Sequence, residues 1–324
     1  MKIVITGGGG FLGHRLAQKI LAGGSLHDAS GAPRAVRELV LVDQAFPGQW
    51  TDPRVRTLVG DVADGRLLKD AIGGDTASVF HLAAIVSGEA EQNFDLGYRV
   101  NVDATRTLLE CCRAAGNRIK VVFASSVAVF GGPLPATVRD DTVVTPQSSY
   151  GTQKAIGELL VTDYSRKGYL DGRSLRLPTI VVRPGKPNRA ASSFASGIIR
   201  EPLAGMEAVC PVGPDVRMWL SSPAAAIDNI IAGHEAAASR FAHTRSANVP
   251  GLCMRVGDMV EALRGIAGDE VAARVRWQYD PAIALLVESW PQDFDTVFGH
   301  SLGMRSDGSF ESVVRSYLAE SGIS

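Results

Sequence analysis

Tyr150 and Lys154 have the residue types and the spacing of an acid–base pair. They lie four positions apart at the start of a segment with helical periodicity, so their side chains would share one face of a helix. A phenol with a pKa of about 10 is a poor base at neutral pH, but a neighbouring ammonium group favours the phenolate. We therefore expect the pair to exchange protons with a substrate, although the same spacing is common on solvent-exposed helix surfaces.

A glycine-rich loop between the first expected strand and the first expected helix could supply a cofactor for that chemistry. Glycines at G-x-x-G-x-x-G spacing allow a tight turn and let a pyrophosphate approach the backbone, and the following helix offers unpaired N–H groups. The strand before the loop and the helix after it favour a dinucleotide site over a purely structural turn. The residues expected to contact the dinucleotide here are Gly7, Gly10, Phe11, Leu12 and Gly13.

The carboxyl ends of the next strands carry further candidates for dinucleotide binding. Asp43 closes the second strand, where a carboxylate accepts hydrogen bonds from the adenosine ribose and disfavours a 2′-phosphate, so NAD is expected rather than NADP. The alternative for Asp43 is a turn residue at a strand end. Asp61 and Val62 follow the third strand and would contact the adenine. The residues after the fourth strand that would let the cofactor cross the sheet edge are Leu82, Ala83 and Ala84.

Two serines and an asparagine complete the candidate catalytic residues. Ser125 and Ser126 end the fifth expected strand, and the carboxyl ends of parallel strands face the ligand crevice in open α/β sheets. One of these hydroxyls could polarise a substrate oxygen beside Tyr150, and the alternative is a capping or turn serine. Asn101 lies in the expected helix 98–115, where a buried amide could hold a water that links Lys154 to solvent.

The elements that must position these residues alternate between strands and helices through residues 1–184. Each expected strand is a nearly continuous apolar run, which is typical of strands buried on both faces of a parallel sheet. The expected strands are 2–6, 38–43, 56–59, 78–82, 120–125 and 174–183, and the helices between them include 11–22, 98–115 and 150–167. This alternation predicts an α/β fold with a Rossmann-type doubly wound parallel sheet, which would bind the cofactor and carry the catalytic residues.

Residues 185–324 predict a smaller, mixed α/β lobe that would bind the substrate, with some elements returning to the main sheet. Helical periodicity is visible at 192–203, 223–239, 256–265 and 281–289. Gly, Pro, Asp and Ser cluster at 25–35 and 132–146, where we expect insertions.

Composition narrows the classes of function. The 324 residues are 45% hydrophobic and 21% charged with a net charge of −1, so no global field attracts nucleic acid or a membrane. No apolar run reaches the roughly 20 residues of a membrane span, and the chain begins directly with a strand, so we expect a cytoplasmic protein. The four cysteines form no C-x-x-C pair, so free thiols are expected and a metal site is not.

In combination, these motifs resemble the extended short-chain dehydrogenase/reductase family. The matching segments are Thr6-Gly7-x-x-Gly10-x-x-Gly13, Asp43, Gly60-Asp61-Val62, His81-Leu82-Ala83-Ala84, Asn101, Ser125-Ser126-x-x-Val129-Phe130-Gly131, Tyr150-x-x-x-Lys154 and Arg183-Pro184, in the family's order over about residues 1–190. The resemblance implies that Tyr150 is the acid–base residue, Ser126 the catalytic serine and Asn101 part of a proton relay. It also implies that Lys154 lowers the pKa of Tyr150 and binds the nicotinamide ribose. Ser125 and Pro184 would be cofactor contacts.

The second lobe departs from the pattern of family members that act on nucleotide sugars. Lys186 stands where those members have an asparagine, and no acidic pair lies near Arg217. A Thr-Asp/Glu pair, which would mark a 4,6-dehydratase, is absent at Ser125-Ser126. Extra cationic and amide groups suit a small anionic substrate, because arginine binds carboxylates through two hydrogen bonds. The candidate substrate residues are Ser87, Ser126, Tyr150, Lys186, Asn188, Arg189 and Arg217.

Residues 177–179 and 183–189 resemble the sugar-acid branch of this family. That branch implies oxidation of the C2 hydroxyl of a four-carbon sugar acid, with D-erythronate as the expected substrate and NAD as the acceptor. One alternative is a nucleotide-sugar 4-epimerase that retains its NAD, and another is a non-catalytic NAD-binding regulator, which the intact Ser126, Tyr150 and Lys154 disfavour. Relatives often form homodimers through the helices corresponding to 98–115 and 150–167, and we expect the same here.

Overall fold

The structure is a computed structural model that describes residues 1–185, 191–241 and 243–322. Its centre is a seven-stranded sheet in the order β12-β8-β7-β6-β1-β4-β5, and every neighbouring pair in it is parallel. Its strands are β1 (Lys2–Thr6), β4 (Glu38–Asp43), β5 (Val55–Val59), β6 (Thr76–His81), β7 (Lys120–Ser126), β8 (Asp171–Leu177) and β12 (Ser246–Asn248). The predicted α/β fold with a doubly wound parallel sheet is confirmed.

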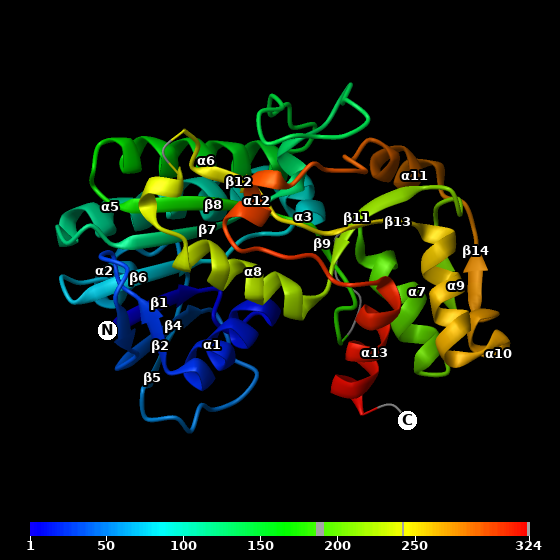
Figure 1. Ribbon diagram of the computed structural model, residues 1–324, viewed down its shortest axis with the longest axis horizontal. Helices are drawn as coiled ribbons and strands as arrows, with labels where there is room; N and C mark the ends of the chain where they lie inside the picture. The colour runs from blue at the N-terminus through cyan, green and yellow to red at the C-terminus, as the bar shows by residue number, and fades with distance from the viewer. Residues whose placement is uncertain (186–190, 242, 323–324) are drawn as a thin grey trace.

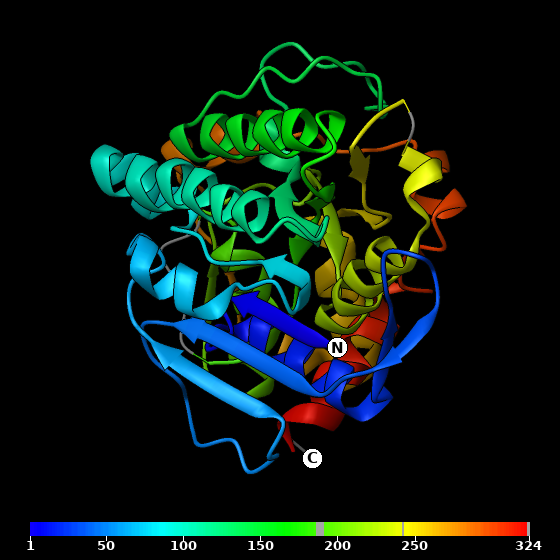
Figure 2. The same ribbon diagram turned by 90° about the vertical axis from the view of Figure 1, so that its left-hand side faces the viewer.

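Burial on both faces explains why the strands read as continuous apolar runs. In β1, Ile3 and Ile5 pack with residues of α1 (Phe11–Gly23) and α8 (Pro223–Glu235), whereas Val4 packs with residues from the opposite face. The helices on that opposite face are α2 (Gly65–Ala71), α5 (Ala104–Ala115) and α6 (Ser149–Arg166). Figures 1 and 2 show the sheet between these two helical layers. Successive side chains of a strand point to opposite faces, so both alternating sets must be apolar.

The second lobe has its own core and two small sheets, at the right of Figure 1. Its strands are β9 (Thr179–Ile180), β10 (Ala208–Cys210), β11 (Arg217–Ser221), β13 (Leu252–Arg255) and β14 (Val275–Trp277). Its helices are α7 (Ser193–Leu203), α9 (Val256–Ala267), α10 (Asp269–Ala272), α11 (Pro281–Glu288) and α13 (Phe310–Ser321). The remaining elements are β2 (Ser25–His27), β3 (Pro33–Ala35), α3 (Ser87–Gln92), α4 (Phe94–Tyr98), α12 (Val297–Ser301), a π-helical turn (Arg99–Asp103) and two 3₁₀ turns (Val127–Val129 and Ala238–Phe241).

The expected strand 174–183 is divided between the two lobes. β8 ends at Leu177, and residues beyond Pro178 pair with β11 as the short strand β9. Proline has no N–H to continue the ladder of hydrogen bonds, so the main-sheet strand ends where Pro178 follows. The chain thereby carries Arg183 out of the main sheet and toward the second lobe.

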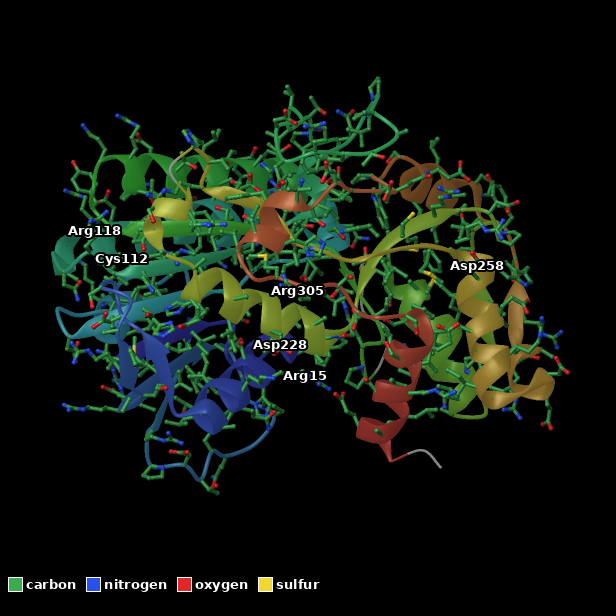
Figure 3. All side chains as sticks on the ribbon, in the orientation of Figure 1. Arg15, Cys112, Arg118, Asp228, Asp258 and Arg305 are labelled. Carbon is green, nitrogen blue, oxygen red and sulfur yellow. The ribbon has the colours of Figure 1, made fainter. Side chains whose placement is uncertain are left out.

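Other connections fasten the second lobe to the first. Both α8 and β12 lie beyond residue 185 in the sequence, yet α8 packs on α1 and β8, and β12 pairs with β8. Arg15 of α1 forms two hydrogen bonds with the carboxylate of Glu320 in α13, with N–O distances of 3.0 and 2.6 Å (Figure 3). Among the described residues, no helix is long and apolar enough to cross a lipid bilayer.

Candidate active site

A cavity of about 820 Å³ lies where the carboxyl ends of the sheet strands meet the second lobe. This volume is within the range of small-molecule and cofactor sites. The predicted site residues that line it are Gly7, Gly10, Phe11, Leu12, Gly13, Asp43, Val62, Leu82, Ala83, Ala84, Ser87, Ser125, Ser126, Tyr150, Lys154, Pro184 and Arg217. The tertiary fold therefore gathers residues from 7 to 217 around one space.

The glycine loop is packed so closely that larger side chains would not fit. A Cβ atom on Gly13 would lie 2.0 Å from the Gly7 carbonyl oxygen, and one on Gly7 would lie 2.7 Å from the Ala83 nitrogen. Gly7 also has φ +75°, a conformation that glycine adopts without strain. No side chain caps the N-terminus of α1. Because its first N–H groups have no capping side chain, this end of α1 fits the pyrophosphate of a dinucleotide.

Asp43 is held against the same loop. One carboxylate oxygen accepts hydrogen bonds from the Gly9 and Gly10 N–H groups at 2.9 and 3.1 Å, and the other accepts from Gln44 at 2.7 Å. A negative charge is thereby fixed at the edge of the cavity beside the glycines. This is where the sequence analysis expected a carboxylate to meet the adenosine ribose.

The two residues predicted to contact adenine lie in different surroundings. Val62 lines the cavity, as predicted for a cofactor contact. Asp61 is not among the described residues that line it, and its carboxylate accepts hydrogen bonds from the Ala63 N–H at 2.9 Å and from Arg99 at 2.5 Å. In this geometry the carboxylate of Asp61 stabilises its own loop and the start of the π-helical turn.

Asn101 is buried within that π-helical turn and does not line the cavity. Its side chain accepts a hydrogen bond from the Ile85 N–H at 2.8 Å and donates to the Ile85 carbonyl at 3.0 Å and to Gln153 at 2.7 Å. The sequence analysis expected a continuous helix over 98–115, and the π turn replaces its first part. Such turns often mark functional sites, and this one joins the loop after β6 to the residue next to Lys154.

The start of α6 brings Tyr150 and Lys154 to the cavity. Ser148 caps the helix by accepting a hydrogen bond from the Gly151 N–H. A Cβ on Gly151 would lie 2.1 Å from the Ala128 carbonyl oxygen, so glycine lets the first turn of α6 approach the segment that follows Ser126. This close approach places the serine and the tyrosine in hydrogen-bonding contact.

Lys154 is buried and points back toward the end of β7. Its Nζ donates a hydrogen bond to the Ala124 carbonyl at 2.8 Å and lies 4.8 Å from the centre of the Phe123 ring. Burial lowers the pKa of Lys154 to about 8, and the carboxylate of Glu158 opposes that shift. The ammonium form is thus partly compensated by nearby oxygen atoms and aromatic rings.

Tyr150 lies near a second cation, Arg183, that the sequence analysis did not place beside it. Burial raises the pKa of its hydroxyl, whereas the Arg183 guanidinium and a hydrogen bond with Ser126 act to lower it. Lys154 is also close, with its Nζ 5.6 Å from the centre of the Tyr150 ring while it donates to the Ala124 carbonyl. No motif in the sequence marked Arg183 as a neighbour of Tyr150, since the two residues belong to different lobes.

The two adjacent serines face different partners. Ser126 accepts a hydrogen bond from the Ala128 N–H at 3.1 Å and also hydrogen-bonds with Tyr150. Ser125 donates to the buried Glu158 carboxylate at 2.6 Å, and that carboxylate is paired with Arg176 at 2.8 Å. Ser126 is therefore the serine in contact with the tyrosine, and Ser125 links β7 to α6.

Two further predicted substrate residues, Ser87 and Arg217, line the cavity. Arg217 opens β11, is exposed and hydrogen-bonds with the Cys253 thiol. Ser87 lies at the start of α3 and lines the cavity. The predicted residues Lys186, Asn188 and Arg189 lie outside the described residues. The second lobe also contributes apolar side chains that the sequence analysis missed, namely Met218, Trp219, Leu286, Trp290 and Pro291.

The sequence is similar to a known protein family and to proteins of known name. The model of the NAD dependent epimerase/dehydratase family matches residues 3–223. D-erythronate dehydrogenase of Cupriavidus necator is 53% identical over 323 residues, which cover 100% of this chain and 99% of that protein. D-erythronate dehydrogenase of Haemophilus influenzae is 44% identical over 319 residues, which cover 98% and 99% of the two chains.

A solved structure matches the complete architecture. It is described as a nucleoside-diphosphate-sugar epimerase from Agrobacterium tumefaciens and is 41% identical, with a TM-score of 0.92. The superposition covers 100% of this chain and 95% of that chain. The likeness thus includes the second lobe as well as the parallel sheet.

Proposed function

The chain belongs to the NAD dependent epimerase/dehydratase family, as the motifs predicted, and from this membership we propose that it is an NAD-dependent dehydrogenase of a small sugar acid. The preferred reaction is oxidation of the C2 hydroxyl of D-erythronate to 2-oxo-tetronate. The observation that carries the proposal is the contact of Ser126 with Tyr150 beside Lys154, in a cavity that also contains the glycine loop. Identities of 53% and 44% over the full length to proteins named D-erythronate dehydrogenase support the substrate.

The cofactor half of the cavity fits NAD. The packing of Gly7 and Gly13 leaves room only for backbone, the N-terminus of α1 suits a pyrophosphate, and the Asp43 carboxylate suits ribose hydroxyls. The same carboxylate would repel the 2′-phosphate of NADP. When bound there, NAD supplies the acceptor for the hydride that leaves C2.

The protein's own residues hold the substrate oxygen and move its proton. Ser126 orients the C2 hydroxyl, and the phenolate of Tyr150 accepts its proton as the carbonyl forms. Lys154 supplies a buried positive charge beside the ring of Tyr150, with its Nζ 5.6 Å from the ring centre, and would bind the nicotinamide ribose. Asn101 and Gln153 fix the loop and helix on either side of this group.

A nucleotide-sugar epimerase is the second candidate, because the similar Agrobacterium tumefaciens structure carries that description. An epimerase would return the hydride to the same substrate, so no NADH would accumulate. A nucleoside diphosphate would also need cationic partners for two phosphates. Of the described cations lining the second lobe's side of the cavity, Arg200 is already paired with Glu201 at 2.5 Å. Arg183 and Arg217 also line the cavity, so the assay below separates the two candidates.

A homodimer is proposed for the outer face of α6 and its neighbours. Leu159 on α6 is 68% exposed and Phe94 on α4 is 57% exposed. Large apolar side chains at adjacent helices are typical of a surface that a second subunit covers. Sedimentation or light scattering of the wild type and of a Leu159→Glu variant would test this arrangement, and a monomeric wild type would contradict it.

The reaction is tested by NADH formation with a panel of substrates. D-erythronate, its stereoisomers, C5 and C6 aldonates and UDP-sugars would each be incubated with NAD⁺ and the purified protein. We expect stoichiometric NADH with a four-carbon 2-hydroxy acid and none with UDP-sugars. Interconversion of UDP-sugars without net NADH would establish the epimerase instead.

A further inference from the structure

Four cationic side chains of the described residues line the cavity, and most of them are already committed to partners. Lys154 donates to the Ala124 carbonyl. Arg200 donates to the Arg183 carbonyl at 2.7 Å and pairs with Glu201. Arg217 is exposed and contacts the Cys253 thiol. The fourth cation, Arg183, lines the same cavity as Tyr150 and Ser126, and its guanidinium acts to lower the pKa of the Tyr150 hydroxyl.

Arg183 is held in place from several directions. Its N–H donates to the Ser196 hydroxyl at 3.1 Å, and its Nε donates to the Ile180 carbonyl at 3.1 Å. Its own carbonyl accepts the hydrogen bond from Arg200. These backbone contacts and the hydrogen bond at Nε fix the position of the guanidinium. Binding a ligand there therefore costs little side-chain conformational entropy.

The chemistry of a 2-hydroxy acid places its carboxylate close to the reacting hydroxyl. The hydroxyl is carried by the carbon next to the carboxyl carbon, so a cation beside one group is also beside the other. If Tyr150 and Ser126 hold the C2 hydroxyl, the carboxylate must lie within reach of a group adjacent to Tyr150. Arginine is suited to this position because its planar fork makes two parallel hydrogen bonds to a carboxylate.

We propose that Arg183 is the carboxylate-binding residue of this site and holds C1 of the acid while Tyr150 and Ser126 hold the C2 hydroxyl. This assignment rests on the proposed function, because it requires a 2-hydroxy acid as the substrate. Arg217, on the exposed edge, would then contact the distal hydroxyls. Arg183 thereby selects acids that carry the hydroxyl next to the carboxylate, and it would discriminate against neutral alcohols.

The test compares Arg183→Met and Arg183→Lys with Arg217→Met and with a control outside the cavity. Arg276→Met is the control, since Arg276 of β14 is exposed, is paired with Glu207 at 2.6 Å and does not line the cavity. Each enzyme is assayed with D-erythronate and with its neutral amide, D-erythronamide. The dissociation constant for NAD⁺ is measured in parallel as a test of correct folding.

We expect Arg183→Met to lower kcat/KM for D-erythronate about 100-fold or more, because two charge-assisted hydrogen bonds are lost. The amide should lose much less, so the preference of the wild type for acid over amide should collapse. Arg183→Lys retains the charge without the fork and should lose about 10-fold on the acid. NAD⁺ affinity should stay within about threefold of the wild type in each variant, since each removes about one contact or none to the cofactor half.

Four results would overturn this assignment. Kinetics of Arg183→Met within threefold of the wild type would remove Arg183 from the carboxylate, and a collapse of acid preference in Arg217→Met instead would move the carboxylate to Arg217. If Arg183→Met fails to bind NAD⁺, the test rests on Arg183→Lys. In that variant, an unchanged preference for acid over amide, with kcat/KM for D-erythronate reduced less than threefold, refutes the proposal. If the wild type oxidises no 2-hydroxy acid, the proposed function and this assignment both fail. If the wild type is active but the Arg183 variants keep its activity and acid preference, only this assignment fails.

Discussion

The two halves of the cavity, which we propose bind the cofactor and the substrate, are built in different ways. The cofactor half, formed by the glycine loop, Asp43 and Val62, consists of short consecutive segments at strand ends, where recognition depends on backbone and close packing. The substrate half, formed by Arg183, Arg217 and the second lobe's apolar residues, consists of single side chains from segments far apart in the sequence. The first arrangement is local and repeated in related folds, whereas the second depends on how the lobes meet.

This difference predicts how substitutions should divide. A change in the cofactor half should alter NAD⁺ affinity with little effect on the acid, and a change in the substrate half should do the reverse. Tyr150 lies between the halves, so its substitution should lower kcat even when both NAD⁺ and the acid are saturating. A substitution in one half that changes the affinity for the ligand of the other half would show that the two halves are coupled through the structure.

The largest expected effect is that of Tyr150→Phe. Removing the phenolic oxygen, which we propose accepts the proton as the phenolate, should lower kcat by about 10²–10⁴-fold, the usual contribution of general acid–base catalysis. The ring remains, so NAD⁺ affinity should change less than threefold or so. Stopped-flow or steady-state assays of NADH formation with D-erythronate measure the first quantity, and fluorescence titration measures the second. Residual turnover above about 1% of the wild type would remove Tyr150 from the proton transfer.

The pH dependence of the same variant adds a second readout. Oxidation needs Tyr150 deprotonated, and burial raises the pKa of its hydroxyl. The rate of the wild type should therefore rise with pH toward that pKa and level off above it. The residual rate of Tyr150→Phe should lack this limb. If the rate of Tyr150→Phe still rises with pH as the wild-type rate does, the pH dependence belongs to another titrating group.

Gly13→Ala should have the next largest effect, confined to the cofactor half. Its Cβ would lie 2.0 Å from the Gly7 carbonyl oxygen, so the loop must open and the N-terminus of α1 must shift. We expect NAD⁺ affinity to fall about 10–100-fold and the free energy of unfolding to drop by about 1–3 kcal/mol, as for other overpacked sites.

Gly23→Ala is the matched control for that change. Gly23 ends the same helix α1, and nothing lies within 4 Å of its Cβ position. Alanine there should bind NAD⁺ as the wild type does and keep or slightly raise stability, because alanine is the better helix former. Equal effects of the two substitutions on NAD⁺ affinity would show that close packing of the loop is not what recognises the cofactor.

Asp43→Asn should have the smallest effect of the three and should change specificity. The amide oxygen of asparagine can still accept from the Gly9 and Gly10 N–H groups, but the charge that repels a 2′-phosphate is gone. The ratio of kcat/KM for NADP⁺ to that for NAD⁺ should rise about tenfold, equivalent to about 1.4 kcal/mol. Asp75→Asn, at an exposed carboxylate paired with Lys2, should leave the ratio unchanged. An unchanged ratio in Asp43→Asn would separate Asp43 from the ribose.

The predictable part of the fold followed from local patterns. The strands β1 and β4 begin and end at the residues expected from their apolar runs, because strands buried on both faces favour apolar side chains at successive positions. The expected helices 11–22 and 150–167 likewise match α1 and α6 to within one residue at each end. The division of 174–183 was missed, since a proline after an apolar run signals a break but not the sheet that the next residues will join.

The unpredictable part of the site involved contacts between the lobes and between layers. Nothing in the sequence connects Arg183 with Tyr150, or Ser125 with Glu158, because charge and hydrogen-bonding partners are chosen by distance in space. The surroundings of Tyr150 and Lys154 illustrate the limit. Helical spacing placed both on one face, but only the packed structure directs the ammonium group toward the Ala124 carbonyl.

By itself the sequence determined the chemistry on offer: a glycine loop, a serine, a tyrosine and a lysine in the order and spacing of one family. These features are local, since the propensities and steric needs that create them act within a few residues. The tertiary structure alone decided that Arg183, from a segment outside the main sheet, lines the same cavity as Tyr150. That choice depends on the chain leaving the main sheet after Pro178 and on the second lobe fixing Arg183, and such long-range packing is not encoded in any single motif.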